Sequence, residues 1–358
     1  MYTYKNQTAG RHWQHDLLNR VLAIIGRKWA VLLCLILVSC GHRDPQEVNE
    51  IRIPNGGVGI GFLPLMAMQK FSLIEKHATT SGLNIRMRWI NVGGPAAEMD
   101  AIFKGTADFI AAGPPAAITV WDKTLGSSKI KGMAAICSVP VYLNTRTEHL
   151  KTLNDIRVDD RIAVTAAKIS IPAIIMQMYA AERYGISDAP HFDPFVLSMS
   201  NAEGALALLS PANAVNAHFS SPPYHQRERR QLSVRTILSS DEIMRGPATF
   251  TMLITSSAFR QRNPRIYAAV MAALQEAIQM VSSDQRLAAK LLLDSMNGGG
   301  FTVNELEQIL KDPAIRFTTT PELVMKYADF MHQTGLITNQ PTSWKDLFFP
   351  EIHDVSGS

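Results

Sequence analysis

Short apolar runs alternate with amphipathic helical stretches from Ile51 onwards, and this alternation restricts the fold more than any other feature of the sequence. Apolar runs of about four to eight residues, bounded by turn residues, predict buried strands, and the stretches between them have the periodicity of helices. A repeated order of strand and helix is typical of βαβ units on a largely parallel sheet. The expected fold class is therefore α/β.

The expected strands and helices follow one another with glycine or proline at most of the turns. Helices are expected at 64–82, 96–104, from Pro114 onwards and at 173–184, and Glu98 is expected to complement the dipole of the second of these near its N-terminus. After Ser256 only helices are expected, with start signals at Asn263, Thr302 and Thr320. Strands are expected at 51–54, 84–90, 108–113, 133–138, 161–165, 195–197, 214–219 and 249–255.

The N-terminal segment has the features of a bacterial lipoprotein signal peptide. Arg27 and Lys28 precede an apolar run at 29–38, which is too short to span a bilayer, and Ser39 and Cys40 follow it. The residues Leu37-Val38-Ser39-Cys40 resemble the lipobox, in which the cysteine is acylated. We therefore expect residues 1–39 to be removed, Cys40 to carry lipid, and residues 40–50 to begin the mature chain as a polar tether.

Charge argues against a nucleic-acid-binding protein, and cysteine content argues against a disulfide-bonded one. The net charge of +4 equals the surplus of basic residues within 1–39, so the remainder is neutral and has no basic block for nucleic acid. Of the three cysteines, Cys34 leaves with the signal, Cys40 takes lipid, and Cys137 remains in an apolar run. We expect Cys137 to be a core side chain and no intramolecular disulfide to form.

A series of short motifs, in a consistent order and spacing, resembles the periplasmic substrate-binding proteins of nitrate, taurine, sulfonate and thiamine-precursor ABC importers. The resemblance covers most of residues 51–259. Two departures concern Asp159-Asp160-Arg161, where a glycine is usual, and Ser221-Pro222, where an acid or tryptophan is common. The motifs are Phe71-Ser72-Leu73-Ile74-Glu75-Lys76, Gly82-Leu83, Val92-Gly93-Gly94-Pro95, Gly105-Thr106-Ala107-Asp108, Ala112-Gly113-Pro114-Pro115-Ala116, residues 155–165 and Phe219-Ser220-Ser221-Pro222-Pro223-Tyr224.

The resemblance implies a two-lobed, type II periplasmic binding protein fold with a ligand cleft between the lobes and a C-terminal helical wrap. Lobe one would comprise 51–140 and 247–358, lobe two would comprise 141–246, and two crossing strands would join them. The implied protein is a monomer on the periplasmic side of a bacterial envelope membrane, anchored there by lipid. It would bind a small molecule and deliver it to an ABC permease and its ATPase, without a cofactor, a metal or nucleic acid.

The expected ligand-binding residues lie at strand-to-helix turns and around a Pro-Pro element. Helix N-termini favour anions, and small residues let a ligand approach their N–H groups, although ordinary βα turns contain the same glycines. A lysine and a hydroxyl at one such turn suit a sulfonate or carboxylate, and aromatic residues beside the Pro-Pro element could form a wall. The candidates are Gly57, Gly61, Gly93, Gly94, Gly113, Pro114, Lys168, Ser170, His218, Phe219 and Tyr224.

The sequence favours a small organic anion, a sulfonate or an aromatic carboxylate, as the ligand. A thiamine-type pyrimidine stacked on the same aromatic residues is the alternative, and a ligand-sensing lobe that signals rather than transports would need the same cleft. His218 and His225 lack a third ligand at metal spacing. The sequence contains no nucleophile elbow, no H-E-x-x-H and no P-loop, so it predicts a binding protein and not an enzyme.

Overall fold

The computed structural model describes residues 47–55, 57–92, 94–211, 215–297 and 299–358, which belong to one folded unit, Glu47–Ser358. The expected signal peptide and Cys40 lie outside the described residues. Residues 47–50 belong to the folded unit and lead directly into its first strand, so they are not part of a tether. Among the described residues, no helix has both the length and the apolar character needed to cross a membrane.

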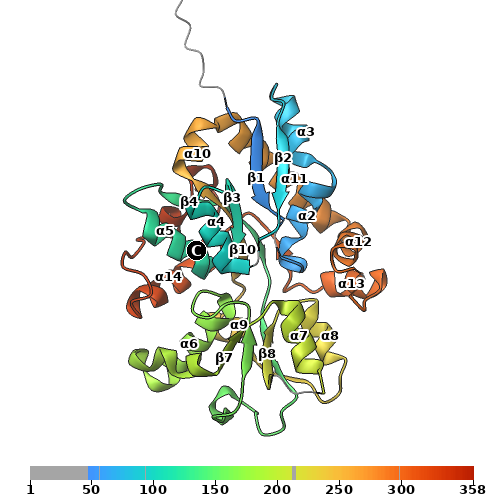
Figure 1. Ribbon diagram of the computed structural model, residues 1–358, viewed down its shortest axis with the longest axis vertical. Helices are drawn as coiled ribbons and strands as arrows, with labels where there is room; N and C mark the ends of the chain where they lie inside the picture. Colours follow the sequence, from blue (N-terminus) through green and yellow to red (C-terminus); the bar gives the residue numbers. More distant parts are fainter. Residues whose placement is uncertain (1–46, 56, 93, 212–214, 298) are drawn as a thin grey trace, which may run out of the picture. The chain divides into compact units, whose positions relative to one another are not determined.

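Lobe one is built on a parallel pair of strands and a four-stranded sheet of order β11-β4-β10-β3 (Figure 1). Strand β10 runs antiparallel to both of its neighbours, and β11 runs antiparallel to β4. The Asp108 N–H donates to the carbonyl of Arg52 over 2.8 Å, and the Arg52 guanidinium pairs with the Asp108 carboxylate, which joins β1 to the start of β3. The strands are β1 (Glu50–Pro54), β2 (Arg86–Ile90), β3 (Phe109–Ala112), β4 (Ile130–Ser138), β10 (Thr249–Ser256) and β11 (Arg316–Phe317).

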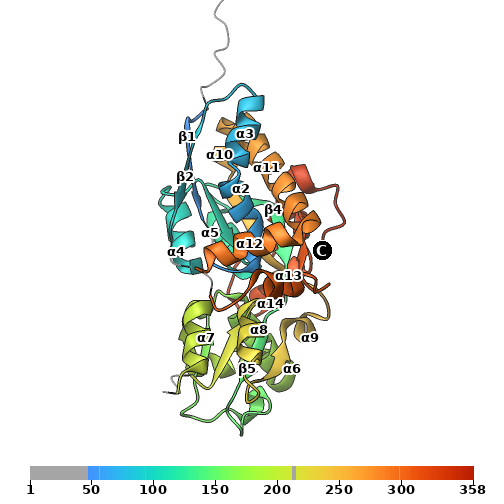
Figure 2. The same ribbon diagram turned by 90° about the vertical axis from the view of Figure 1, so that its right-hand side faces the viewer.

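Helices from both ends of the described chain cover lobe one. The long helix α11 packs against α2 and α3, and α14 packs against α5, so the C-terminal helices wrap the lobe as expected. Figure 2 shows α2, α3 and α11 on the same side of β1 and β2. The helices are η1 (Ile60–Phe62), α2 (Leu63–Lys70), α3 (Leu73–Thr80), α4 (Gly94–Phe103), α5 (Pro114–Thr124), α10 (Ser257–Arg262), α11 (Pro264–Ser283), α12 (Gln285–Ser295), α13 (Val303–Leu310), α14 (Val324–Gln333), η4 (Trp344–Leu347) and η5 (Pro350–Ile352).

Lobe two has a five-stranded sheet of order β7-β6-β8-β5-β9, with β6 parallel to β7 and β8 and with β5 antiparallel to β8 and β9. In Figures 1 and 2, α6 lies on one side of this sheet and α7 and α8 lie on the other. The elements are β5 (Tyr142–Thr145), η2 (Leu153–Asp155), β6 (Ile162–Val164), α6 (Ile171–Tyr184), η3 (Ile186–Phe195), β7 (Val196–Ser198), α7 (Asn201–Leu209), β8 (Ala217–Ser220), α8 (Tyr224–Arg229), β9 (Arg235–Ser239) and α9 (Ser240–Met244).

The chain passes between the lobes twice, and this explains why the sheets are not largely parallel. It leaves lobe one between β4 and β5, and it returns between α9 and β10. A returning strand enters the sheet of lobe one from the opposite direction, so β10 is antiparallel to β3 and β4. The divisions expected at 140/141 and 246/247 fall within these two connections, and as lobe boundaries they stay a prediction.

Three local expectations differ from the structure in informative ways. The helix expected at 64–82 is two helices, because Ser72 adopts a left-handed conformation with a φ of 48°. Among the three expected helix starts after Ser256, the one at Thr302 is confirmed together with its capping box, which Thr302 forms with Glu305. Asn263 precedes α11 but makes no capping bond, and no helix begins at Pro321, because α14 starts at Val324.

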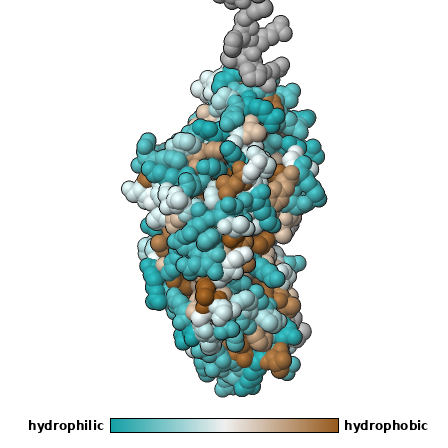
Figure 3. All heavy atoms as spheres, turned by 90° about the vertical axis from the view of Figure 1, so that its left-hand side faces the viewer, coloured by the Kyte–Doolittle hydropathy of each residue, from teal (hydrophilic) through white to brown (hydrophobic). Residues whose placement is uncertain are grey.

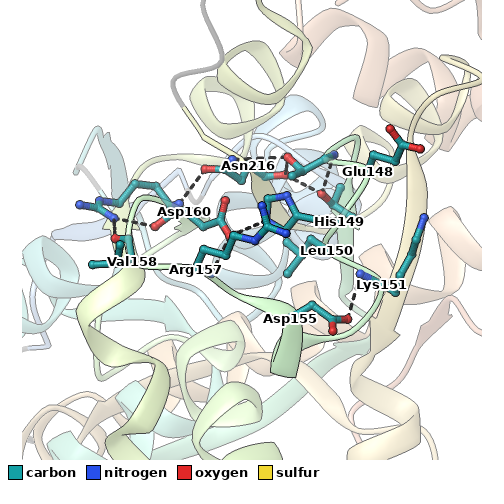
Figure 4. A network of polar contacts seen from close by, with 12 residues as sticks. Glu148, His149, Leu150, Lys151, Asp155, Arg157, Val158, Asp160 and Asn216 are labelled. Atoms are coloured by element: carbon teal, nitrogen blue, oxygen red, sulfur yellow. Dashed lines mark hydrogen bonds and ion pairs between the residues drawn. The ribbon is translucent and has the colours of Figure 1, made fainter.

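A polar network stabilises the connection between β5 and β6 in lobe two (Figure 4). The Asp160 carboxylate accepts a hydrogen bond from the Arg157 N–H over 2.7 Å and lies 2.9 Å from His149 Nε2. The Asn216 side chain accepts from the Arg161 N–H over 2.8 Å, which connects this loop to the start of β8. These side chains therefore hold the loop in place.

The core and the surface follow the usual distribution of side chains. Cys137 is fully buried, as expected, and burial raises the pKa of its thiol to about 12. On the face drawn in Figure 3, apolar residues form separate patches between hydrophilic ones. The most exposed large apolar side chains are single residues such as Val158, Leu206 and Leu232. Scattered exposed apolar residues of this kind are normal for a folded domain.

Candidate functional site

A cavity of about 590 Å³ is lined by residues of both lobes. A volume of several hundred Å³ is typical of sites for small organic molecules. Lobe one contributes Gly57, Val58, Phe62, Asn91, Val92, Gly94, Pro95, Glu98, Ala111, Ala112, Gly113, Ala116, Phe250 and Thr251. Lobe two contributes Val141, Thr165, Ile169, Ser170, Ile171, Pro172, Ser198, Met199, Ser200, Asn201, Ala202, Glu203, Phe219 and Tyr224.

Helices α4, α5, α6 and α7 begin at the cavity, two from each lobe. Gly94 is the first residue of α4, and the N-cap residues of α5, α6 and α7 are Gly113, Ser170 and Ser200. All four residues belong to the cavity lining. The positive end of the helix dipole makes such positions suited to anions, although at α6 and α7 the hydroxyls of Ser170 and Ser200 already accept one N–H each. The convergence of four of them gives the cavity a region that favours negative charge.

Apolar and aromatic side chains form much of the remaining wall. Phe62 comes from η1, Phe250 from β10, Phe219 from β8 and Tyr224 from the start of α8. Burial raises the pKa of Tyr224, so its hydroxyl is neutral at ordinary pH. A wall of this composition suits a ligand with an apolar or aromatic body.

The charged residues in the described cavity lining are both acidic, Glu98 and Glu203, and no Lys, Arg or His is among them. Glu203 is exposed, and its carboxylate accepts hydrogen bonds from Ser200 N and Oγ, which lower its pKa. Glu98 is only 3% exposed, and its Oε2 has no hydrogen-bond partner. Burial raises the pKa of Glu98 to about 8, although a hydrogen bond from the Ala111 N–H opposes this shift.

The structure brings six of the candidate binding residues together in the cavity lining. They come from four strand-to-helix turns, from strand β8 and from the start of α8, which places residues distant in sequence around one space. Gly93 lies outside the described residues. The six are Gly57, Gly94, Gly113, Ser170, Phe219 and Tyr224.

Gly61 and Pro114 lie behind the cavity wall and are not part of its lining. A Cβ atom on Gly61 would lie 2.3 Å from the ring of Phe250, so the absence of a side chain lets that ring occupy its place in the wall. Pro114 is buried as the first residue of α5, where a missing N–H is tolerated. Gly61 therefore supports the lining indirectly, through Phe250.

Lys168 and His218 also lie outside the lining. Lys168 is exposed, with a left-handed φ of 69°, while the neighbouring Ser170 reaches the cavity. His218 has no solvent exposure, and its Nδ1 lies 2.6 Å from a carboxylate oxygen of the equally buried Glu228. Its ring packs against α7, where a Cβ atom on Gly204 would lie 2.5 Å away. His218 is thus a buried residue of lobe two and does not face the ligand space.

Phe62, Phe250 and Glu98 are cavity residues that the sequence did not single out for binding. Phe62 and Phe250 lie within η1 and β10, where an apolar residue has the same pattern whether it lines a cavity or fills a core. The sequence places Glu98 near the N-terminus of a helix beginning at Ala96, but α4 begins at Gly94 and has no acidic residue in its first turn. The two extra residues move Glu98 into the second turn and into the cavity.

No protein-family model matches the sequence, and no curated protein matches it, but solved structures do. The alkanesulfonate-binding protein SsuA from Xanthomonas axonopodis pv. citri, bound to MOPS, has a TM-score of 0.63 and 17% identity over 82% of this chain and 95% of its own. A Candida albicans protein, the CA3427 gene product, which exhibits the generic periplasmic binding protein fold, has a TM-score of 0.60 and 15% identity over 83% of this chain and 92% of its own.

The periplasmic nitrate-binding protein NrtA from Synechocystis PCC 6803 has a TM-score of 0.52 and 14% identity over 69% of this chain and 66% of its own. The expected resemblance to sulfonate- and nitrate-binding proteins is therefore confirmed at the level of the fold. The mixed α/β lobes and the helical wrap agree with it. This chain has the periplasmic binding protein fold, in a form similar to that of the sulfonate-binding protein SsuA.

Proposed function

We propose that this protein is the substrate-binding component of an ABC importer and has no enzymatic activity of its own. The observation that carries this proposal is the cavity of about 590 Å³, which both lobes line and at which four helices begin. The similarity to binding proteins for alkanesulfonate and nitrate supports it. The ligand would be captured between the lobes and passed to a permease driven by an ATPase.

We further propose that the ligand is a small organic molecule with a sulfonate or carboxylate group. The N-termini of α4, α5, α6 and α7 would hold the anionic group, and they replace Lys168 in the role that the sequence suggested for it. Phe62, Phe219 and Phe250 would contact an apolar or aromatic body. Nitrate alone would leave most of this space and its apolar wall unused.

A ligand screen with a blocked-cavity variant tests this proposal. The full chain is heated with sulfonates, aromatic carboxylates and pyrimidines, since a ligand at 100 times its Kd stabilises the native state by about 2.7 kcal/mol. Ala202→Trp places a large side chain in the cavity from the start of α7 and should abolish any stabilisation. Leu206→Trp, on the exposed surface of the same helix, is the matched control and should retain it.

The aromatic wall makes a thiamine-type pyrimidine the second candidate ligand. A flat, neutral ring could stack on Phe62, Phe219 or Phe250 without using the helix N-termini. Stabilisation by pyrimidines alone, lost in Ala202→Trp, would favour this ligand over an organic anion.

A ligand-sensing protein would bind the same ligand, so binding does not separate sensing from transport. Neighbouring genes for a permease and an ATPase would favour import, and a neighbouring kinase gene would favour sensing.

We also propose that residues 1–39 are a lipoprotein signal peptide and that acylated Cys40 anchors the protein on the periplasmic side of an envelope membrane. The apolar run at 29–38 and the lipobox-like Leu37-Val38-Ser39-Cys40 support this proposal.

Metabolic labelling with palmitate, followed by membrane fractionation, tests the anchor. The wild-type protein should incorporate label and sediment with membranes, whereas Cys40→Ala should do neither. Cys137→Ala is the control, because Cys137 is buried in the core and should not affect labelling. Equal membrane association of Cys40→Ala and the wild type would contradict the proposed anchor.

A further inference from the structure

Glu98 brings a carboxyl group to the cavity that the protein leaves incompletely paired. The residue lies in the second turn of α4, is 3% exposed, and belongs to the cavity lining. Its Oε2 makes no hydrogen bond. The carboxyl group accepts one hydrogen bond from the protein, from the N–H of Ala111. A buried polar atom without a partner is unusual, because it costs the full loss of hydration without compensation.

Among the described residues that line the cavity, none carries a positive charge that could balance a Glu98 carboxylate. Among the described lining residues, the other titratable groups are Glu203 and Tyr224, an acid and a neutral phenol. Glu203 is already hydrogen-bonded to Ser200, and Tyr224 titrates above its ordinary pKa. Small side chains, Ala111, Ala112 and Ala116, line the lobe-one wall and leave room for a ligand atom.

A purely structural role does not explain this arrangement. A buried, unpaired acid weakens a fold, and an apolar residue at the same place on α4 would pack without that cost. The position becomes favourable when an N–H group of a ligand in the cavity donates to this carboxyl group. A protonated amine is the best such partner, because it also neutralises the charge that burial opposes.

We propose that Glu98 is the specificity residue for a protonated amino group on the ligand, and that the ligand is a zwitterion and not a simple organic anion. Its ammonium group would pair with the Glu98 carboxyl group, and its sulfonate or carboxylate group would lie at the helix N-termini. The apolar wall would enclose the part of the ligand between the two charges. This inference rests on the proposed function, and it adds the second charge of the ligand.

Calorimetric titration of the full chain near neutral pH with three related probes tests the inference. The probes are p-toluenesulfonate, p-(aminomethyl)benzenesulfonate and benzylamine, of which the second carries both charges on the same ring. The wild type should bind the zwitterion at least about tenfold more tightly than p-toluenesulfonate, a gain expected for a desolvated charge pair. Glu98→Gln keeps the size of the side chain and should reduce this ratio to about one. Glu148→Gln, at an exposed position after β5, should leave the ratio unchanged.

The pH dependence of the affinity supplies a second test, because a purely structural role of Glu98 would not change it. In the free protein the Glu98 carboxyl group is protonated up to about pH 8, so binding of an ammonium group must release that proton. The affinity of the wild type for the zwitterion should therefore rise between about pH 6 and pH 8. Glu203 and Tyr224 titrate outside this range, so the profile of Glu98→Gln should be flat.

The possible failures of the two proposals are distinguishable. If the wild type binds p-toluenesulfonate or another compound of the screen as tightly as the zwitterion, or if Glu98→Gln preserves the ratio, the role of Glu98 is overturned while the binding function stands. If neither the three probes nor any compound of the screen binds the wild type, the binding function itself is overturned. Retention of the wild-type melting profile by Glu98→Gln at acidic pH would show that the variant is folded.

Discussion

At the scale of single residues, Glu98 should make the free energy of unfolding depend on pH. Its pKa is raised from 4.5 to about 8 in the folded chain. Below about pH 4 the group is protonated in both states and has no effect. As the pH rises towards 8, the unfolded chain ionises while the folded chain does not, so the native state loses stability by about 1.4 kcal/mol per pH unit.

Glu98→Gln removes this loss, so the variant should become progressively more stable than the wild type between about pH 5 and pH 8, by a few kcal/mol in total. Denaturant titrations of both proteins at several pH values measure the difference. A difference that stays constant with pH would contradict the raised pKa of Glu98. Glu148→Gln should track the wild type throughout, because Glu148 is exposed.

The behaviour of neighbouring residues explains which parts of the site the sequence could predict. Residues at turns after strands, such as Gly113 and Ser170, were predictable because helix N-termini converge on one end of a sheet. His218 and Phe219 were predicted to act together, but successive side chains of a strand point to opposite faces. Phe219 therefore lines the cavity, while His218 packs with Glu228 and Gly204 on the other face of β8.

At the scale of elements, the start of α11 depends on a residue far away in the sequence. The Glu47 carboxylate accepts hydrogen bonds from the backbone N–H groups of Arg265 and Ile266, over 3.2 and 2.9 Å. Asn263, the expected cap, instead accepts from the N–H of Val48 through its Oδ1. The sequence predicts where the helix starts. It does not predict that Glu47 replaces Asn263 as the cap, because Glu47 lies more than 200 positions away.

Glu47→Ala should therefore destabilise the protein by about 1 to 2 kcal/mol, as the loss of a helix cap does elsewhere. The Glu47 side chain is 4% exposed and also pairs with Arg265, so water cannot fully replace it. Chemical denaturation of the full chain measures the effect, with Glu148→Ala as the control. An unchanged free energy of unfolding for Glu47→Ala would show that the cap contributes nothing.

Glu322 illustrates why the helix expected at Pro321 is absent. Its carboxylate accepts hydrogen bonds from Ser138 and from Arg316. Its N–H donates to Thr249 Oγ1 over 2.8 Å, and its carbonyl accepts from the Thr249 N–H over 3.0 Å. These contacts hold the end of β4 and the start of β10 together, at the points where the chain leaves and re-enters lobe one. Tertiary contacts therefore override the local capping signal at Thr320 and Pro321.

At the scale of the whole folded unit, the two crossings should allow the lobes to close on a ligand. The first crossing lies between Ser138 and Tyr142, and the second contains Arg245 and Gly246, with left-handed φ angles of 64° and 153°. Two short connections permit a hinge motion in which each lobe moves as a unit. The cavity is lined from both sides, so a bound ligand gains contacts when the lobes approach.

Ligand binding should therefore reduce the radius of gyration of the full chain in small-angle scattering. The ligand is the compound that stabilises the wild type most in the thermal screen, added at saturation. Ala202→Trp should give the same scattering with and without this compound, while Leu206→Trp should compact like the wild type, because Leu206 lies on the exposed surface of α7. If the wild type binds the ligand calorimetrically but does not compact, the two crossings do not act as a hinge, and the ligand enters a cavity that is already formed.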